Sequence, residues 1–298
     1  MRRSPLASLP SSLTLGVFGV LGVIGVIGLS GCPSGSSSAP TVPRPAMNQL
    51  PDGPPLITPG ESMTYRVQLK GFELAQYQIS VGVEAAEVGG KPAIVVQSHA
   101  KSVGLANFAV KVDDYFSSWI DVSTGRSLRW LADEYAKNGT DKERTEALLH
   151  QRAGDTFPMS FRLNDDAPTP EVQKASLADV WDYNAFLIAM RAWEGSPGSK
   201  IAVEVLRSRY LWHIDMTIKA KEKLVTELGE LPTLRFDATT YKLDRSGARL
   251  PDTDRIFSIW ISDDGDRVPL QIISTSDYGD VKMQITDYQP GNGRRFRQ

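Results

Sequence analysis

Hydrophobic and polar residues alternate along most of the chain that follows residue 60. In the run RYLWHIDMTIKA, for example, Ile214, Met216 and Ile218 fall on one face, and Asp215 and Thr217 fall on the other. A period of two is typical of strands that bury one face and leave the other in water. Ten to twelve such segments, separated by turn signals and without repeated crossover helices, predict a mainly β fold with a large antiparallel sheet.

One segment breaks this alternation. From Ser176 to Gly195 the residues Leu177, Val180 and Leu187 recur at helical spacing, and Ser176 followed by Asp179 resembles a capping box. A helix with this much apolar surface among strands predicts a plug on the concave face of a bent sheet. We therefore expect residues 60–290 to form one domain, a curved sheet or partial β-barrel with one helix packed on the concave face.

The N-terminus has the pattern of an export signal. Two arginines precede an uncharged apolar run, Leu13 to Leu29, and residues 1–31 therefore read as a signal peptide. The following tetrad Leu29-Ser30-Gly31-Cys32 resembles the lipobox of bacterial lipoproteins. The resemblance implies cleavage before Cys32 and attachment of a diacylglyceryl group and a palmitate-type acyl chain there. Pro33 stands where the sorting rule of enteric bacteria would need Asp for retention, which implies an outer-membrane anchor with the domain in the periplasm.

Residues 32–59 are rich in Pro, Ser and Gly, a composition that buries too little apolar surface to offset the entropy of ordering. We expect them to form an extended tether between the lipid and the domain. At the other end, residues 291–298 form a basic tail that contains Arg294, Arg295 and Arg297.

Charge and rare residues exclude several classes of protein. With 33 basic and 35 acidic residues, the chain lacks the basic excess of a nucleic-acid binder. Cys32 is the only cysteine, and the three histidines His99, His150 and His213 stand apart from one another, so no zinc-binding spacing occurs. We therefore expect no metal, no cofactor and no nucleic-acid partner.

A cluster of acids lies in the sequence Ser262-Asp263-Asp264-Gly265-Asp266-Arg267, between two apolar runs. Its spacing is not that of a calcium-binding EF-hand, and neighbouring residues on a tight turn do not flank a sugar as the two carboxylates of a glycosidase must. Asp-Gly between alternating apolar segments is a strong hairpin signal. We interpret the cluster as a turn.

The run Ile259-Trp260-Ile261-Ser262-Asp263-Asp264, followed by Arg267-Val268-Pro269, resembles the WLSDD…R-P pattern of the bacterial domain of unknown function family 3108 (DUF 3108). Gly60-Glu61 with Thr64-Tyr65, Val112-Asp113-Asp114 and Tyr278-Gly279 agree in order and spacing. Where family members often carry a PAGTF-like turn, this chain has Leu231-Pro232-Thr233-Leu234. The resemblance implies an exported, mostly antiparallel β domain and assigns no activity.

Four residues are candidates for contact with a ligand: Trp181, Trp212, Trp260 and Asp114. A lipid-anchored, apolar-lined sheet favours a non-enzymatic role, either binding or carrying an apolar envelope component or serving as an adaptor in envelope assembly. The alternative is an enzyme that acts on cell-wall or surface glycans. It would use paired carboxylates, drawn from Asp113, Asp114 and the acids of the 263–266 turn.

Overall fold

The computed structural model describes residues 49–104, 106, 111–135 and 139–297. Within these residues the chain forms fifteen strands, one α-helix, α2 (Tyr183–Arg191), and one 3₁₀ turn, η1 (Leu149–Gln151). The strands are β1 (Ser62–Leu69), β2 (Phe72–Val88), β3 (Lys91–Ser102), β4 (Asp113–Asp121), β5 (Ser127–Tyr135), β6 (Lys142–Ala147), β7 (Thr156–Leu163), β8 (Thr169–Lys174), β9 (Val180–Asp182), β10 (Lys200–Arg207), β11 (Tyr210–Thr226), β12 (Gly229–Leu243), β13 (Arg255–Ser262), β14 (Pro269–Ser276) and β15 (Gly279–Gln289).

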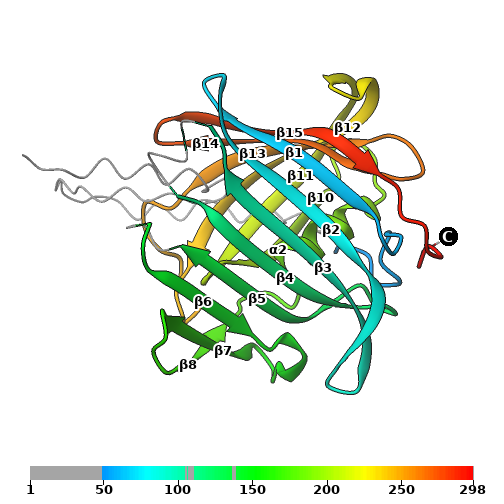
Figure 1. Ribbon diagram of the computed structural model, residues 1–298. Coiled ribbons are helices and arrows are strands. Elements are labelled where there is room, and N and C mark those ends of the chain that lie inside the picture. Colours follow the sequence, from blue (N-terminus) through cyan, green and yellow to red (C-terminus); the bar gives the residue numbers. More distant parts are fainter. Residues whose placement is uncertain (1–48, 105, 107–110, 136–138, 298) are drawn as a thin grey trace, which may run out of the picture.

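All fifteen strands belong to one sheet in the order β8-β7-β6-β5-β4-β3-β2-β1-β15-β14-β13-β12-β11-β10-β9. Every neighbouring pair is antiparallel except β9 and β10, and the first and last strands, β1 and β15, lie side by side in the middle. The sheet curls so that β2–β6 face β10–β14 with α2 between them (Figure 1). The expected fold, a curved antiparallel sheet with one helix on its concave face, is confirmed.

The alternation of residue types decides which face of each strand turns inward. On β1, Met63, Tyr65 and Val67 are fully buried, whereas the residues between them are partly exposed. The turns between strands carry the backbone conformations that glycine permits. Gly89 and Gly90, which join β2 to β3, both have positive φ, as a two-residue hairpin turn of the primed type requires. The inward side chains and α2 together form one hydrophobic core.

The helix begins at Tyr183, seven residues after Ser176, where the sequence pattern placed its start. Asp182 is its N-cap, because the Asp182 carboxylate accepts a hydrogen bond of 2.9 Å from the amide of Ala185. Residues Val180–Asp182 pair with β10 instead, so Val180, one of the residues that suggested an earlier start, belongs to strand β9. A three-residue strand followed by a helix has no clear period, and the sequence pattern could not separate the two.

All nine residues of α2 are buried, and the side chain of Asn184 has hydrogen-bond partners in the sheet. Asn184 donates to the carbonyls of Val96 and Phe116, each at 3.2 Å, and accepts from the hydroxyl of Ser98 at 2.8 Å. These bonds fix the first turn of the helix to β3 and β4, because an unpaired amide at this depth would cost about 1–3 kcal/mol.

The C-terminal end of α2 carries a buried ion pair. Arg191 and Glu61 are each about 1% exposed and lie 2.8 Å apart. Glu61 also accepts hydrogen bonds from the amide of Thr58 and the hydroxyl of Tyr288, while Arg191 donates to the carbonyl of Asp266. Each charge thus has more than one partner, as burial of an ion pair demands, and only Nη1 of Arg191 has no hydrogen-bond partner among the described residues.

Packing extends N-terminal of the expected domain boundary at residue 60. Leu50 and Ile57 are buried in the core, and the amide of Gly53 bonds to the carbonyl of Thr124. The basic tail is also packed: Arg297 donates to the carbonyl of Pro54, and Arg295 pairs with Asp266. The expected signal peptide, Cys32 and the first part of the tether lie outside the described residues. No helix of the described residues is long and apolar enough to cross a bilayer.

One end of the open sheet is covered by a loop. Among the described strands β8 is the last at this end of the sheet, but the amide of Lys174 donates to the carbonyl of Arg245 at 3.0 Å, and Gln173 donates to the carbonyl of Asp244. The Arg245 guanidinium pairs in turn with Glu171. Because an unprotected edge invites pairing with another chain, this loop and its arginine protect the fold from aggregation.

We predict that the buried ion pair is a main support of the fold. Arg191→Met leaves the Glu61 carboxylate buried without its cation and should lower the free energy of unfolding by about 3–5 kcal/mol. Arg66→Met, which breaks the exposed pairs with Glu73 and Glu227, should cost less than about 1 kcal/mol. Urea unfolding of both variants tests this, and equal losses would contradict it. The double variant E61Q/R191M should recover part of the loss.

Candidate functional site

Two of the four candidate ligand contacts, Trp181 and Trp212, lie in the core. Trp181 is fully buried, its indole N–H donates to Asp179 at 2.8 Å, and the guanidinium of Arg126 covers its ring at 4.1 Å. Trp212 points inward from β11 and is about 3% exposed. Neither ring presents a face to solvent, so both contribute to packing.

Asp113 and Asp114 face opposite sides of β4. Asp113 is paired with His99 at 2.7 Å on the outer face. Asp114 points inward, is 6% exposed and accepts a hydrogen bond of 2.8 Å from the amide of Tyr135. The register of β4 and β5 sets it opposite Glu134, whose carboxylate accepts from the hydroxyl of Ser208. The structure thus brings together two carboxylates of which the sequence marked only one.

The pKa values of this acid pair are raised. Burial raises the pKa of Asp114 to about 6, although hydrogen bonds from backbone amides oppose the shift. Burial also raises the pKa of the half-buried Glu134 to about 7, with the nearby Asp114 adding to the effect. Both shifts have the same physical cause, since a carboxylate is poorly solvated at this depth.

The acidic turn at 263–266 packs against the C-terminal end of the buried helix. The Asp264 carboxylate accepts from the amides of Asp266 and Arg267 and from the hydroxyl of Ser262, which shapes the turn. Arg267 then donates to the carbonyls of Arg191 and Trp193, at 2.8 and 2.9 Å. These carbonyls at the C-terminal end of α2 have no partner inside the helix, so the turn satisfies them. Its interpretation as a turn agrees with this geometry.

The fourth candidate, Trp260, lies on the outer face of the sheet under a curled hairpin. Strands β11 and β12 are long, and a bulge between Ile218 and Lys221 bends their outer part. The hairpin tip (yellow in Figure 1) folds over the neighbouring strands. There Glu222 accepts from the indole N–H of Trp260, the carbonyl of Val225 accepts from Gln284, and Glu227 pairs with Arg66 on β1.

The sheet and the base of this hairpin enclose a trough of about 860 Å³ on the outer face of β10–β15. Its floor is made of side chains that lie opposite one another on neighbouring strands, and they form rows that cross the sheet. One row holds Asp215, Thr239, Ile256, Thr275 and Asp280, and the next holds Lys200, Thr217, Asp237, Ser258 and Ile273. Arg235 and Trp260 form the wall beside the hairpin.

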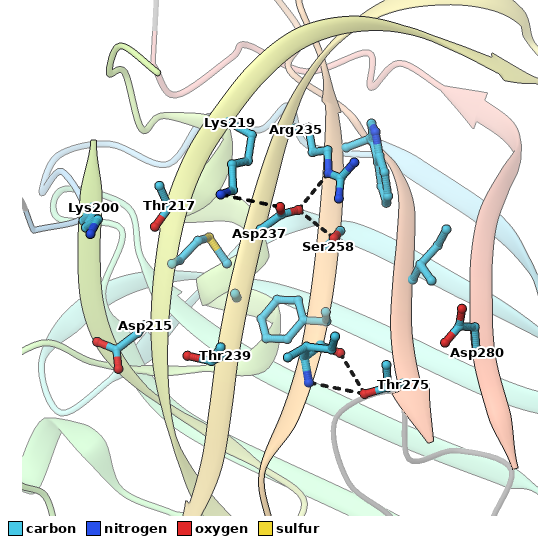
Figure 2. A pocket seen from close by; sticks show the side chains of 16 residues that line it. Lys200, Asp215, Thr217, Lys219, Arg235, Asp237, Thr239, Ser258, Thr275 and Asp280 are labelled. Atoms are coloured by element: carbon cyan, nitrogen blue, oxygen red, sulfur yellow. Dashed lines mark hydrogen bonds and ion pairs between the residues drawn. The ribbon is translucent and has the colours of Figure 1, made fainter. Parts of the chain in front are cut away.

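Asp237 is the centre of the polar contacts in the trough (Figure 2). It accepts from Arg235 and from the hydroxyl of Ser258, both at 2.7 Å, and lies 4.0 Å from the ammonium group of Lys219. Burial raises the pKa of Asp237, but the Ser258 hydrogen bond and the Arg235 guanidinium lower it by more, so the net shift is downward. The carboxylate is therefore ionised at neutral pH and held in one position.

His213 and Asp215 continue the polar face of β11 at the edge of the trough. His213 stacks on Tyr241 at 4.8 Å, and its Nε2 lies 3.5 Å from Asp215. The trough row that contains Asp215 holds no serine, and the pair resembles a packing arrangement more than a nucleophile and its base.

No group of three His, Cys, Asp or Glu side chains in the described part of the chain could hold a metal ion. The trough residues Thr217, Asp237, Thr239 and Ser258 were not marked by the sequence pattern. They stand at outward positions of alternating strands, where polar residues are ordinary, and only the strand register and the bent hairpin show that they share one concave surface.

The sequence matches the model of the family "Protein of unknown function (DUF3108)" over residues 64–286, which is most of the chain. The protein therefore belongs to this family, as the residues of the Ile259–Asp264 run suggested. No curated protein sequence matches the chain.

Several solved structures are similar to this one, including proteins from Brucella, Bacteroides and Parabacteroides. A β-barrel-like protein of the family DUF1849 from Brucella abortus shares 6% identity, with a TM-score of 0.51, over 79% of this chain and 99% of its own. An inferred exported protein with a YmcC-like fold from Bacteroides fragilis shares 9% (TM-score 0.33; 80% and 99% covered). An inferred lipoprotein from Parabacteroides distasonis shares 10% (TM-score 0.31; 80% and 100% covered). At these identities the first likeness supports the β-barrel-like fold.

We predict that the two adjacent acids of the turn differ in their effect on stability. Asp264→Ala removes the acceptor of three hydrogen bonds and should lower the free energy of unfolding by about 1–3 kcal/mol. Asp263→Ala breaks only a pair with the exposed Lys221 and should cost less than about 1 kcal/mol. Urea unfolding measures both losses. A larger loss for Asp263→Ala would show that the turn is not held as described.

The acid pair predicts a pH dependence of stability. Between about pH 4.5 and 7 the native state binds more protons at Asp114 and Glu134 than the unfolded state does, so the free energy of unfolding should fall as pH rises. Glu134→Gln cannot ionise and keeps an acceptor for Ser208. The free energy of unfolding of this variant, relative to that of the wild type, should therefore rise by about 1–3 kcal/mol between pH 4.5 and pH 8. Parallel stability profiles of the two proteins would contradict this.

Proposed function

We propose that the protein is a lipid-anchored, non-enzymatic binding protein, held at the outer membrane through Cys32 with its domain in the periplasm, and that it binds an envelope component in the outer trough. The lipobox-like tetrad before Cys32 supports the anchor. The family and the β-barrel-like relative support the scaffold that the anchor would carry.

The proposed binding role rests on one observation: the concave face is filled, whereas the outer face has a trough. The concave face holds α2, whose nine residues are all buried. The crevice between the N-terminal segment and the side of this helix that carries Ile188 and Ala189 measures about 10 Å³, which is room for one water at most. The outer trough of about 860 Å³ is within the range of ligand sites. These facts favour binding on the outer face over carriage of an apolar molecule inside the sheet.

The alternative, an enzyme acting on glycans, requires two carboxylates on either side of a groove open to substrate. Asp113 is paired with His99, and Asp264 is held in its turn by three hydrogen bonds. Asp114 and Glu134 do face each other, but Asp114 is 6% exposed. The acids of the trough are engaged by cations or spread along its length. We therefore favour binding over hydrolysis.

Site-specific photo-crosslinking in living cells tests the proposed site. We expect a benzophenone amino acid in place of Thr239, on the trough floor, to capture an adduct in cells that express the full chain. The same replacement at Asp133, on the outer face of β5, should capture none, because this residue does not line the trough. Adducts at both positions or at neither would contradict a binding role for the trough.

Mass spectrometry of the same full-length protein, extracted from isolated outer membranes, tests the anchor. The N-terminal peptide should begin at Cys32 and carry a diacylglyceryl group and a further acyl chain. The Cys32→Ser variant should appear unacylated in the soluble fraction or retain its signal peptide. An unmodified Cys32 in the wild type would overturn the proposed attachment.

A further inference from the structure

We infer that the trough takes a neutral, polyhydroxylated chain, that is, an oligosaccharide segment. This inference rests on the proposed function, since it names the ligand class of the same trough. It depends on four properties of the site: its length, its charge balance, its uncommitted hydroxyl groups and its location on strands that are paired on both sides.

The trough is long in the direction that crosses the strands. It extends from Lys200 on β10 to Asp280 on β15, a span of five strand spacings. At about 4.8 Å per spacing the trough is roughly 24 Å long. A site of this shape suits several linked units of a linear chain better than one compact small molecule.

The charges that line the trough cancel. Three cations, Lys200, Lys219 and Arg235, stand among three carboxylates, Asp215, Asp237 and Asp280. The two signs are interleaved, as in the contact of Asp237 with both Arg235 and Lys219. A polyanion would meet carboxylates along the whole floor, and a polycation would meet cations, so charge complementarity favours a neutral ligand.

The groups left available in the trough match hydroxyl groups. For Thr217 and Thr239 no hydrogen-bond partner of the hydroxyl is found among the described residues, and each hydroxyl both donates and accepts. The neighbouring carboxylates accept only. Sugar hydroxyls can satisfy both kinds of group, and the apolar C–H faces of sugar rings can lie on Ile256, which is 57% exposed, and on Ile273. Figure 2 shows the threonines and aspartates spaced across successive strands of this floor.

The rival ligand is an extended peptide, which proteins often bind by adding it as a strand to a sheet edge. Strands β11–β14 are paired on both sides, so their backbone groups are committed to the sheet. A peptide in the trough would have to satisfy its own backbone groups with side chains that lie in irregular polar and apolar order. This requirement favours the saccharide.

Isothermal titration of the full-length protein in detergent tests the ligand class. The probes are two neutral hexasaccharides, chitohexaose and maltohexaose, with hexagalacturonate and a neutral hexapeptide for comparison. We expect at least one neutral hexasaccharide to bind at least about tenfold more tightly than either comparison probe. The double variant T217V/T239V, which removes two hydroxyls at nearly constant volume, should weaken that binding at least about tenfold. The matched control Thr64→Val, on the outer face of β1, should leave it unchanged.

Each result has a distinct meaning. Tighter binding of hexagalacturonate overturns the neutral charge of the ligand, tighter binding of the peptide overturns the saccharide, and either result leaves the trough as a binding site. Failure of every probe while Thr239 still captures an adduct in cells likewise overturns only the ligand class. Failure of every probe together with no adduct overturns both this inference and the proposed function. Saccharide binding that T217V/T239V leaves intact overturns the trough as its site.

Discussion

The fold depends on the burial of a helix with polar ends inside a sheet. Helix termini leave amide and carbonyl groups without partners, and at this depth no bulk water can supply them. The structure meets this demand from both sides: Asp182 and Asn184 bind the first turn to β3 and β4, and Arg267 closes the last turn. The ion pair of Arg191 and Glu61 then ties the helix to the start of β1. Fifteen strands curl around one short element whose two ends find these partners in the sheet and its turns.

The helix occupies the concave face of the sheet, and this bears on where a ligand can bind. A curved sheet with an empty concave face is suited to enclosing an apolar ligand, but here the concave face carries a helix and the core. Recognition is left to the outer face, where the bulge after Ile218 bends the β11–β12 hairpin back over its neighbours. A flat outer face would offer no concave surface. The hairpin supplies one wall, and the rows of polar side chains on β10–β15 become the floor of a trough.

The sequence predicted the strands well, because a period of two follows directly from burial of one face, as Ile214, Met216 and Ile218 show. It also predicted the turn at Asp264 and the presence of one helix. It could not give the neighbours of each strand, since pairing of β1 with β15 joins residues more than 200 positions apart. The trough escaped prediction for the same reason. Thr239 and Asp237 look like any outward polar residues until register and the bent hairpin place them together.

The residues of the family pattern, Ile259–Asp264, hold the fold together, whereas the trough residues line a surface. Ile259 and Ile261 point into the core, Asp264 shapes the turn that closes the helix, and Trp260 points outward to hold the curled hairpin through Glu222. One short segment therefore joins helix, sheet and hairpin. The floor residues Thr217, Thr239 and Asp237 instead stand at outward positions of β11 and β12, away from the core. The scaffold residues fix the shape of the trough, and the floor residues set its chemistry.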